Sequence, residues 1–256
     1  MKVIAVANQK GGAGKTSTAA ALWAYLNAHG RKALAVDMDA QGNLSLIADA
    51  ETDGPTVFGA LLREIQLQDA IQHTAQGDIV AASPLQSAAD TALQMLGKER
   101  RLKEALDTVA DMYDFAIIDT PPHMGVLTIN ALAAADRVLI PAQADLFSFH
   151  GIGQIADSIR DVREYCNNPS LQVDGILLTR YSDRANVSKA VRDAMQSKAE
   201  AMGGRLYAAT IREAVAVKET QIAHKSILDY APGAKVAEDY TEFCKEFLEG
   251  VKEDEH

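Results

Sequence analysis

Short apolar runs alternate with longer segments of helical periodicity along almost the whole chain. Seven of these runs predict β-strands, and they lie at about residues 3–8, 33–37, 78–82, 114–119, 137–141, 173–179 and 205–210. Strands that alternate with helices favour a parallel sheet that is covered on both faces. We therefore expect an α/β fold of the P-loop NTPase type: a doubly wound, mainly parallel sheet of about seven strands with helices on both faces.

Three of the expected helical segments have clear boundaries. A helix from about Lys15 to His29 should end at Gly30, because glycine adopts the left-handed conformation after a helix at little cost. The leucines between residues 84 and 110 fit two helices that are hinged near Gly97. A C-terminal helix is expected at about residues 232–249, where apolar residues share one face.

Composition narrows the class of protein. The 256 residues suit one domain spanning 1–256, and 48% apolar with only 5% aromatic residues predicts a core of Ala, Val, Ile and Leu. Cys166 and Cys244 are far apart and fit free thiols of a reducing compartment. No leader and no apolar run near the ~20 residues of a membrane span is present, so we expect a cytoplasmic protein without a membrane partner.

Charge is distributed unevenly. The net charge of −10 disfavours a generic nucleic-acid binder, because affinity for the phosphate backbone comes mainly from clustered Lys and Arg. Residues 180–225, however, hold nine basic and five acidic side chains, so this segment is +4 and the remainder is −14. One face of the molecule could therefore still bind an anion.

The first apolar run leads into a glycine-rich turn, which precedes an alanine-rich helix. Backbone N–H groups of such a turn converge on phosphate oxygens at a helix N-terminus, where the helix dipole also favours negative charge. Lys15 would neutralise the β- and γ-phosphates, and the Thr16 hydroxyl would bind Mg²⁺. The strict motif has glycine where this chain has Gln9, and a second lysine, Lys10, follows it. The expected nucleotide-binding residues are Gly11, Gly12, Ala13, Gly14, Lys15, Thr16 and Ser17.

Four segments in order resemble the ParA/MinD superfamily of P-loop ATPases. Residues 9–16 are similar to its deviant Walker A motif, 35–43 to its second aspartate motif and 113–122 to its Walker B segment. Residues 177–186 resemble, less specifically, the ParA segment that opens the DNA-binding surface. The likeness covers essentially the whole chain.

The resemblance implies roles for particular residues. Lys10, Lys15 and Asp39 would be catalytic: Lys10 would reach the partner's phosphates in a nucleotide-sandwich dimer, and Asp39 would position the attacking water. Thr16 and Asp119 would hold Mg²⁺, Asp119 through a water. The plainer alternatives are a solvated loop charge for Lys10, a turn acid for Asp39 and a helix cap for Asp119. Ala40 stands where the family usually has proline, which leaves the rigidity of this loop open.

The basic segment offers candidate phosphate contacts for DNA. These are Arg184, Lys189, Arg212, Lys218 and Lys225, with Arg192 beside them. Such contacts position a protein on DNA without reading bases, so binding would be non-specific and sensitive to salt. An ordinary solvated face is the alternative.

The resemblance implies a ParA/Soj-type DNA-partitioning ATPase that uses ATP and Mg²⁺. Its ATP-dependent homodimer would bind non-specific DNA on the nucleoid, and a ParB-like centromere-binding protein would stimulate hydrolysis and release. A MinD-like or other positioning ATPase without DNA binding is an alternative, although the acidic tail disfavours MinD-like membrane binding. A metabolic P-loop ATP-dependent ligase is the alternative from another class.

Overall fold

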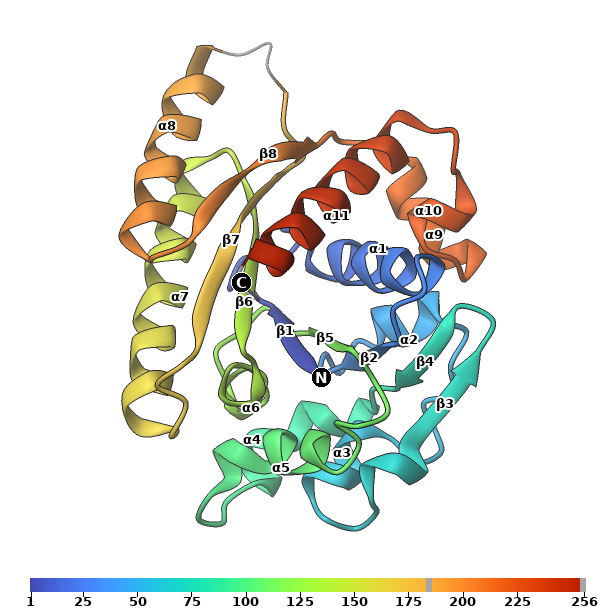
Figure 1. Cartoon of the computed structure of the whole chain (residues 1–256). Helices are drawn as coiled ribbons and strands as arrows, with labels where there is room; N and C mark the ends of the chain where they lie inside the picture. The colour runs from blue at the N-terminus through green and yellow to red at the C-terminus, as the bar shows by residue number, and fades with distance from the viewer. Residues whose placement is uncertain (183–185, 254–256) are drawn as a thin grey trace.

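Eight strands form one sheet within residues 1–182 and 186–253, the part of the chain that this computed structural model describes (Figure 1). The strand order across the sheet is β3-β4-β2-β5-β1-β6-β7-β8. The strands are β1 (Lys2–Val6), β2 (Ala33–Asp37), β3 (Ile71–Thr74), β4 (Gly77–Val80), β5 (Phe115–Asp119), β6 (Arg137–Gln143), β7 (Gln172–Thr179) and β8 (Arg205–Ile211).

All seven expected strands are present, and β3 is an eighth that the pattern did not predict. It pairs antiparallel with β4 at the edge of the sheet, whereas all other neighbouring strands are parallel. None of its four side chains is fully buried, so it has no apolar run to mark it. The expectation of a doubly wound, mainly parallel sheet is confirmed.

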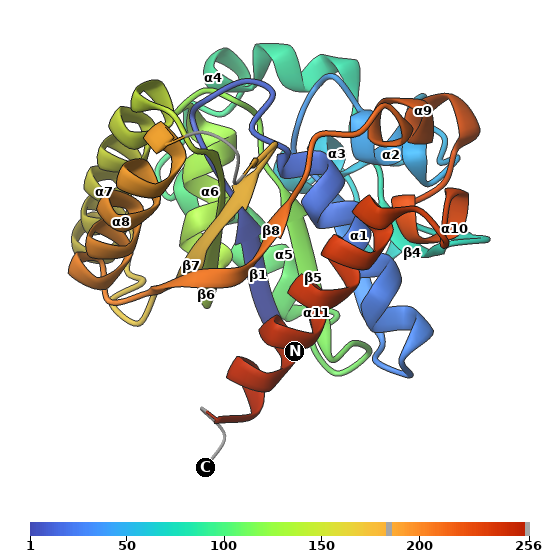
Figure 2. The ribbon, with the colours of Figure 1, turned by 90° about the horizontal axis from the view of Figure 1, so that it is seen from above.

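Helices cover both faces of the sheet (Figures 1 and 2). One face packs against α1 (Lys15–Ala28), α2 (Asn43–Ile47), α9 (Ala216–Ala223), α10 (Ile227–Tyr230) and α11 (Lys235–Glu253). The other face packs against α3 (Val57–Leu61), α4 (Ala89–Ala92), α5 (Arg101–Asp107), α6 (Val126–Ala134), α7 (Leu146–Tyr165) and α8 (Asn186–Ala201). Three short 3₁₀ helices join them: η1 (Leu67–Ala70), η2 (Pro84–Ala88) and η3 (Lys98–Arg100).

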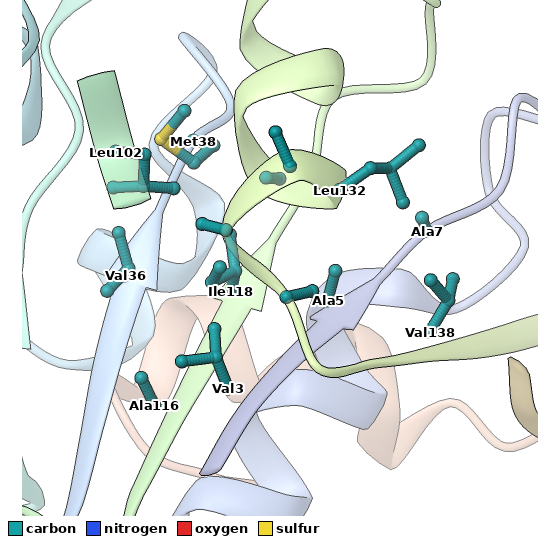
Figure 3. Packing of buried hydrophobic residues seen from close by; sticks show 14 of the residues in the cluster. Val3, Ala5, Ala7, Val36, Met38, Leu102, Ala116, Ile118, Leu132 and Val138 are labelled. Carbon is teal, nitrogen blue, oxygen red and sulfur yellow. The ribbon is translucent and has the colours of Figure 1, made fainter. Parts of the chain in front are cut away.

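Alternation along the central strands divides the core between the two faces. In β1, Val3 and Ala5 belong to the cluster under α5 and α6, while Ile4 and Val6 belong to the cluster under α1 and α11. Figure 3 shows the first cluster, in which Leu102 of α5 lies near the side chains of neighbouring strands. The sheet is therefore buried on both faces, as the apolar composition of its strands requires.

The helix predictions are confirmed in part. Helix α1 ends at Ala28, and Gly30 has a φ of 73°, as expected. Between residues 84 and 110 the chain forms η2, α4, η3 and α5 instead of two helices, and Gly97, at φ 74°, still marks the turn. Both cysteines are free. Among the described residues no helix is long and apolar enough to cross a membrane.

Candidate nucleotide-binding site

The three motifs with candidate chemistry follow neighbouring strands at the carboxyl edge of the sheet. In strands β2, β5 and β1, Asp37, Asp119 and Val6 lie side by side, since Asp119 is in register with both of the others. The glycine-rich loop follows Val6, and Asp39 follows Asp37 by two residues. Parallel topology thus places all three motifs beside one another, where ligands of such sheets bind.

An open cavity of about 340 Å³ lies between these loops. Six of the seven residues expected to bind nucleotide line it, together with Asp39. The exception, Ala13, is buried. The remaining lining residues come from later parts of the chain and from the loop after β2: Gln41, Asn43, Pro122, Arg180, Val217, Lys218 and Gln221.

Glycines shape the loop, and the ends of β6 and β7 hold it in place. Gly14 has a φ of 91°, and a Cβ there would meet the Thr179 side chain at 3.3 Å, so only glycine fits without strain. The Thr179 hydroxyl donates to the Ala13 carbonyl over 2.8 Å. Gln143 Nε2 donates to the Gly12 carbonyl over 3.0 Å. The loop is therefore anchored on its carbonyl side.

Lys15 lies inside this cradle. Burial lowers the pKa of its ammonium, while the nearby carboxylates of Asp119 and Asp39 oppose that shift. Its Nζ donates to the Lys10 carbonyl at 3.4 Å. Lys15 is buried at the N-terminus of α1, and its ammonium makes one long hydrogen bond. A cation in this position is suited to an anionic ligand.

Thr16 and two buried aspartates form the second part of the site. The Thr16 hydroxyl donates to Asp119 Oδ2 over 2.6 Å, and Asp119 Oδ1 is buried without a hydrogen-bond partner. Burial, and then the charge of Asp37, raise the pKa of Asp119 well above its usual range. Burial likewise raises the pKa of Asp37 to about 6. An unpartnered carboxylate oxygen beside a hydroxyl and a second carboxylate fits a divalent cation with oxygen ligands.

Asp37 holds the loop that presents Asp39. Its carboxylate accepts the Asp39 N–H over 3.1 Å and the N–H and hydroxyl of Ser45, both over 2.8 Å. Asp39 itself is half-buried on the cavity wall, and its Oδ1 accepts the Gln41 N–H over 3.0 Å. Asp39 thus offers the cavity a carboxylate that a turn orients, although Ala40 replaces a stiffer proline.

Lys10 is turned away from the cavity of its own subunit. Its Nζ pairs with Asp145 at 2.5 Å and donates to Gln143 Oε1 at 3.1 Å and to Ser148 Oγ at 3.3 Å. The Lys10 N–H donates to Asn8 Oδ1 over 3.0 Å, which fixes the base of the side chain. Lys10 is not among the residues that line the cavity. Asp145 was not predicted as a partner of Lys10, because it lies 135 positions away along the chain.

Comparison with other proteins shows the family to which this chain belongs. A family model described as an AAA domain matches residues 1–173. The sporulation initiation inhibitor protein Soj of Bacillus subtilis is 35% identical over 251 residues, which cover 96% of this chain and 97% of Soj. The chromosome partitioning protein ParA of Myxococcus xanthus is 35% identical over 252 residues, covering 96% of this chain and 88% of that protein. This chain belongs to the ParA/Soj family of P-loop ATPases.

Solved structures of a further relative bear on the ParA/Soj fold and its ligand. A structure of cobyrinic acid a,c-diamide synthase from Mycobacterium smegmatis has a TM-score of 0.82 at 32% identity, covering 98% of this chain and 95% of that one. Another structure of that protein, with bound ATP analogue and magnesium, has a TM-score of 0.77 and covers 92% of this chain and 98% of that one. The family fold therefore extends beyond proteins named for partitioning.

A smaller cavity of about 60 Å³ adjoins the phosphate cradle of this ParA/Soj-family chain. It shares Gly14, Ser17, Arg180, Val217 and Lys218 with the larger cavity. The rest of its lining comes from Thr179, from Tyr240 of α11 and from residues 211–214 at the end of β8 and just after it. None of these residues was expected to line a cavity, and Arg212 was expected to contact DNA, although the ends of the expected strands 173–179 and 205–210 marked where they lie.

The described residues among the expected DNA contacts have different surroundings. Arg212 is bound by Asp239 through Nε at 2.6 Å and Nη2 at 2.7 Å, and Lys218 lines both cavities. Lys225 is exposed, and Lys189 belongs to α8. Arg184 lies outside the described residues. This set therefore stays a prediction.

Proposed function

We propose that this chain is an ATP-dependent DNA-partitioning ATPase. Its ATP-bound sandwich dimer binds DNA non-specifically on the nucleoid, and a ParB-like centromere-binding protein stimulates hydrolysis and release. The observation that carries the proposal is the position of Lys10, which belongs to the phosphate loop but lies outside its own subunit's cavity. A second loop lysine in this position is suited to a phosphate held by another subunit.

ATP and Mg²⁺ fit the residues present. The N–H groups of residues 11–17 and the Lys15 ammonium would bind the phosphates, and the smaller cavity after β7 and β8 would take the base. Thr16 and Asp119 would hold Mg²⁺, which supplies charge neutralisation at the β- and γ-phosphates. Asp39 would accept a hydrogen bond from the attacking water. Hydrolysis would accordingly require magnesium.

Lys10 makes ATP the link between two subunits. To reach a partner's phosphates it would exchange Asp145 for a more highly charged anion, so the dimer would form only when both cradles hold ATP. A cation supplied in trans also stabilises the charge that develops on the transferred phosphoryl group. Dimerisation would therefore report the nucleotide state.

DNA binding is supported by the named relatives and by local charge. Soj is named for the inhibition of sporulation initiation and ParA for chromosome partitioning, a process that acts on DNA. In this chain the basic excess of residues 180–225 would be doubled in a dimer. Within the described residues, Arg212 is bound by Asp239, Lys218 lines the cavities and Lys225 is exposed.

A metabolic ATP-dependent ligase is a second candidate, and the similarity to the mycobacterial cobyrinic acid a,c-diamide synthase favours it. Such an enzyme would hydrolyse or transfer phosphate in response to a small substrate and would not respond to DNA. A positioning ATPase of the MinD type would dimerise on ATP and likewise ignore DNA. Turnover with and without duplex DNA separates both from the partitioning ATPase.

Mixing two inactive variants tests whether Lys10 acts in trans. Lys10→Ala keeps Asp39, and Asp39→Ala keeps Lys10. A mixed dimer then has one cavity with Lys15 and Asp39 from one subunit and Lys10 from the other. We expect each variant alone to lose about 100-fold or more of the ATPase rate, and the mixture to recover measurable turnover.

Both variants retain Lys15 and Thr16 and should therefore bind ATP, so a loss of activity in the mixture cannot be due to a loss of ATP binding. If Lys10 acted within its own subunit, no cavity of the mixed dimer would be complete and the mixture would stay inactive. That result would contradict the proposed dimer. Lys10→Ala alone should bind ATP but remain monomeric in light scattering, while Lys32→Ala, at the far edge of the sheet, should dimerise normally.

A further inference from the structure

The segment from Pro84 to Arg101 exposes three large apolar side chains. Leu85, Met95 and Leu96 are 68%, 47% and 101% exposed, respectively. Buried Leu93 and Ala89 hold the same segment against the core, so the segment is anchored and not merely extended. Exposed apolar groups on an anchored segment are typical of interaction surfaces.

A buried cation without an anion lies at the end of this segment. Arg101 is only 7% exposed, and its Nε and Nη1 have no hydrogen-bond partner. Nη2 contacts the sulfur of Met95, which is a weak acceptor. Leaving guanidinium N–H groups unpaired in the interior is costly, and a carboxylate would satisfy them in pairs.

Local charge also favours an acidic partner. Lys98, Arg100 and Arg101 lie within four positions with only Glu99 between them, a local charge of +2 on a chain whose net charge is −10. Lys103 and Glu104 are already engaged by Asp107 and Arg63. The local excess of positive charge is therefore available to an incoming carboxylate.

Two side chains tie the segment to the start of α6, which follows the loop after Asp119. Asp90 Oδ1 accepts the Val126 N–H over 2.8 Å, and a Cβ on Gly125 would lie 2.9 Å from Asp90 Oδ2. Asn130 is fully buried; it accepts the Leu102 N–H over 3.1 Å and donates to the Lys98 and Val126 carbonyls, both over 2.8 Å. Displacing the segment would therefore move the N-terminus of α6 and the loop at residues 120–125.

We propose that residues 84–101 form a docking surface for an amphipathic helix of a regulatory protein, with apolar side chains against Leu85, Met95 and Leu96 and a carboxylate that displaces Met95 from Arg101. Docking shifts the Asp90 and Asn130 contacts and so adjusts the loop that follows Asp119. The effect on ATP turnover rests on the proposed function; the docking itself does not.

The test uses a displayed library of 18-residue helices, randomised over Leu, Ala, Glu, Lys and Gln. The library is selected on the full chain and counter-selected on Leu96→Ser. We expect enrichment of helices with an apolar face flanked by Glu, and a loss of affinity of at least tenfold for Leu96→Ser in fluorescence anisotropy. Ile222→Ser is the matched control: Ile222 is 83% exposed on α9, which packs on the opposite face of the sheet, and this variant should bind the peptide normally.

Two further measurements test the role of Arg101 and the coupling between the docking surface and the loop at residues 120–125. Arg101→Lys keeps the charge but loses the planar fork, so peptide affinity should fall while folding is retained. Bound peptide should change hydrogen exchange at residues 120–130. Enrichment of basic helices, equal binding to Leu96→Ser, or no enrichment would overturn the docking surface. ATP-dependent DNA binding is measured separately for wild type and for Leu96→Ser. If neither protein binds DNA, the proposed function is overturned and the docking result is unaffected.

Discussion

Replacing Asp145 with asparagine should make the ATP-bound dimer form more readily. Asp145 holds Lys10 in the structure and also caps α7, because its Oδ1 accepts the Ser148 N–H over 2.7 Å. Burial raises the pKa of Asp145, but hydrogen bonds from Lys10 and the Ser148 N–H outweigh it, so the net pKa is lowered and the group is ionised at neutral pH. Asparagine caps a helix as well as aspartate does, so Asp145→Asn removes the charge and keeps the cap.

The expected size of the effect follows from exposure. The side chains of Lys10 and Asp145 are 26% and 35% exposed, so their pair resembles a surface ion pair, worth ~0.2–1 kcal/mol. A dimer breaks two such pairs, which amounts to ~0.4–2 kcal/mol. At about 1.4 kcal/mol per tenfold, the dimer Kd should fall by a factor of ~2 to ~30.

Sedimentation velocity over a range of protein concentrations measures this Kd directly. The measurement is made with ATP and magnesium in an Asp39→Ala background, in which ATP should persist. Asp157→Asn is the control: it removes a carboxylate from the same helix, where Asp157 pairs with Arg160 and is 64% exposed. An unchanged or weaker dimer in Asp145→Asn, with Asp157→Asn behaving as wild type, would refute the reasoning.

Two further expectations concern the buried carboxylates and the basic segment. Burial raises the folded-state pKa of Asp37 to about 6 and that of Asp119 well above its usual range, so their contribution to stability is full below about pH 4 and is lost as pH rises through the folded-state pKa of each group. Asp119→Asn should therefore raise the free energy of unfolding by ~1–3 kcal/mol at pH 7.5 without magnesium, and by almost nothing at pH 4, in urea titrations; equal stability of variant and wild type at pH 7.5 would contradict this. Arg184→Ala combined with Arg212→Ala should lower ATP-dependent affinity for random duplex DNA, whereas Arg31→Ala, at the opposite edge of the sheet, should not; unchanged affinity in the double variant would remove both arginines from the DNA surface.

The pattern of apolar residues was sufficient for most of the fold. Central parallel strands are buried on both faces, so β1, β2 and β5 appear as apolar runs, and β2 and β5 each end in an aspartate. Strand β3 was missed because an edge strand exposes polar side chains such as His73, which leave no apolar run. The breakup of residues 84–100 into short helices was missed because leucine spacing alone does not show where a helix is interrupted.

The site was predictable where its chemistry is local and was not predictable where it depends on contacts across the chain. The loop from Gly11 to Ser17 is contiguous, so its residues could be named from the motif. The partners that hold it, Gln143 and Thr179, lie more than 100 positions away and meet it only because β6 is next to β1 and β7 is next to β6 in the sheet order.

Binding to random-sequence duplex DNA tests the central claim most directly. Fluorescence anisotropy is measured with ATP, with ADP and without nucleotide, each at two salt concentrations. The expected result is binding only with ATP, with a Kd that rises about tenfold per doubling of salt for a dimer making ~4 phosphate contacts. Dimerisation on ATP without DNA binding in any state would contradict the partitioning function and favour a ligase or a positioning ATPase.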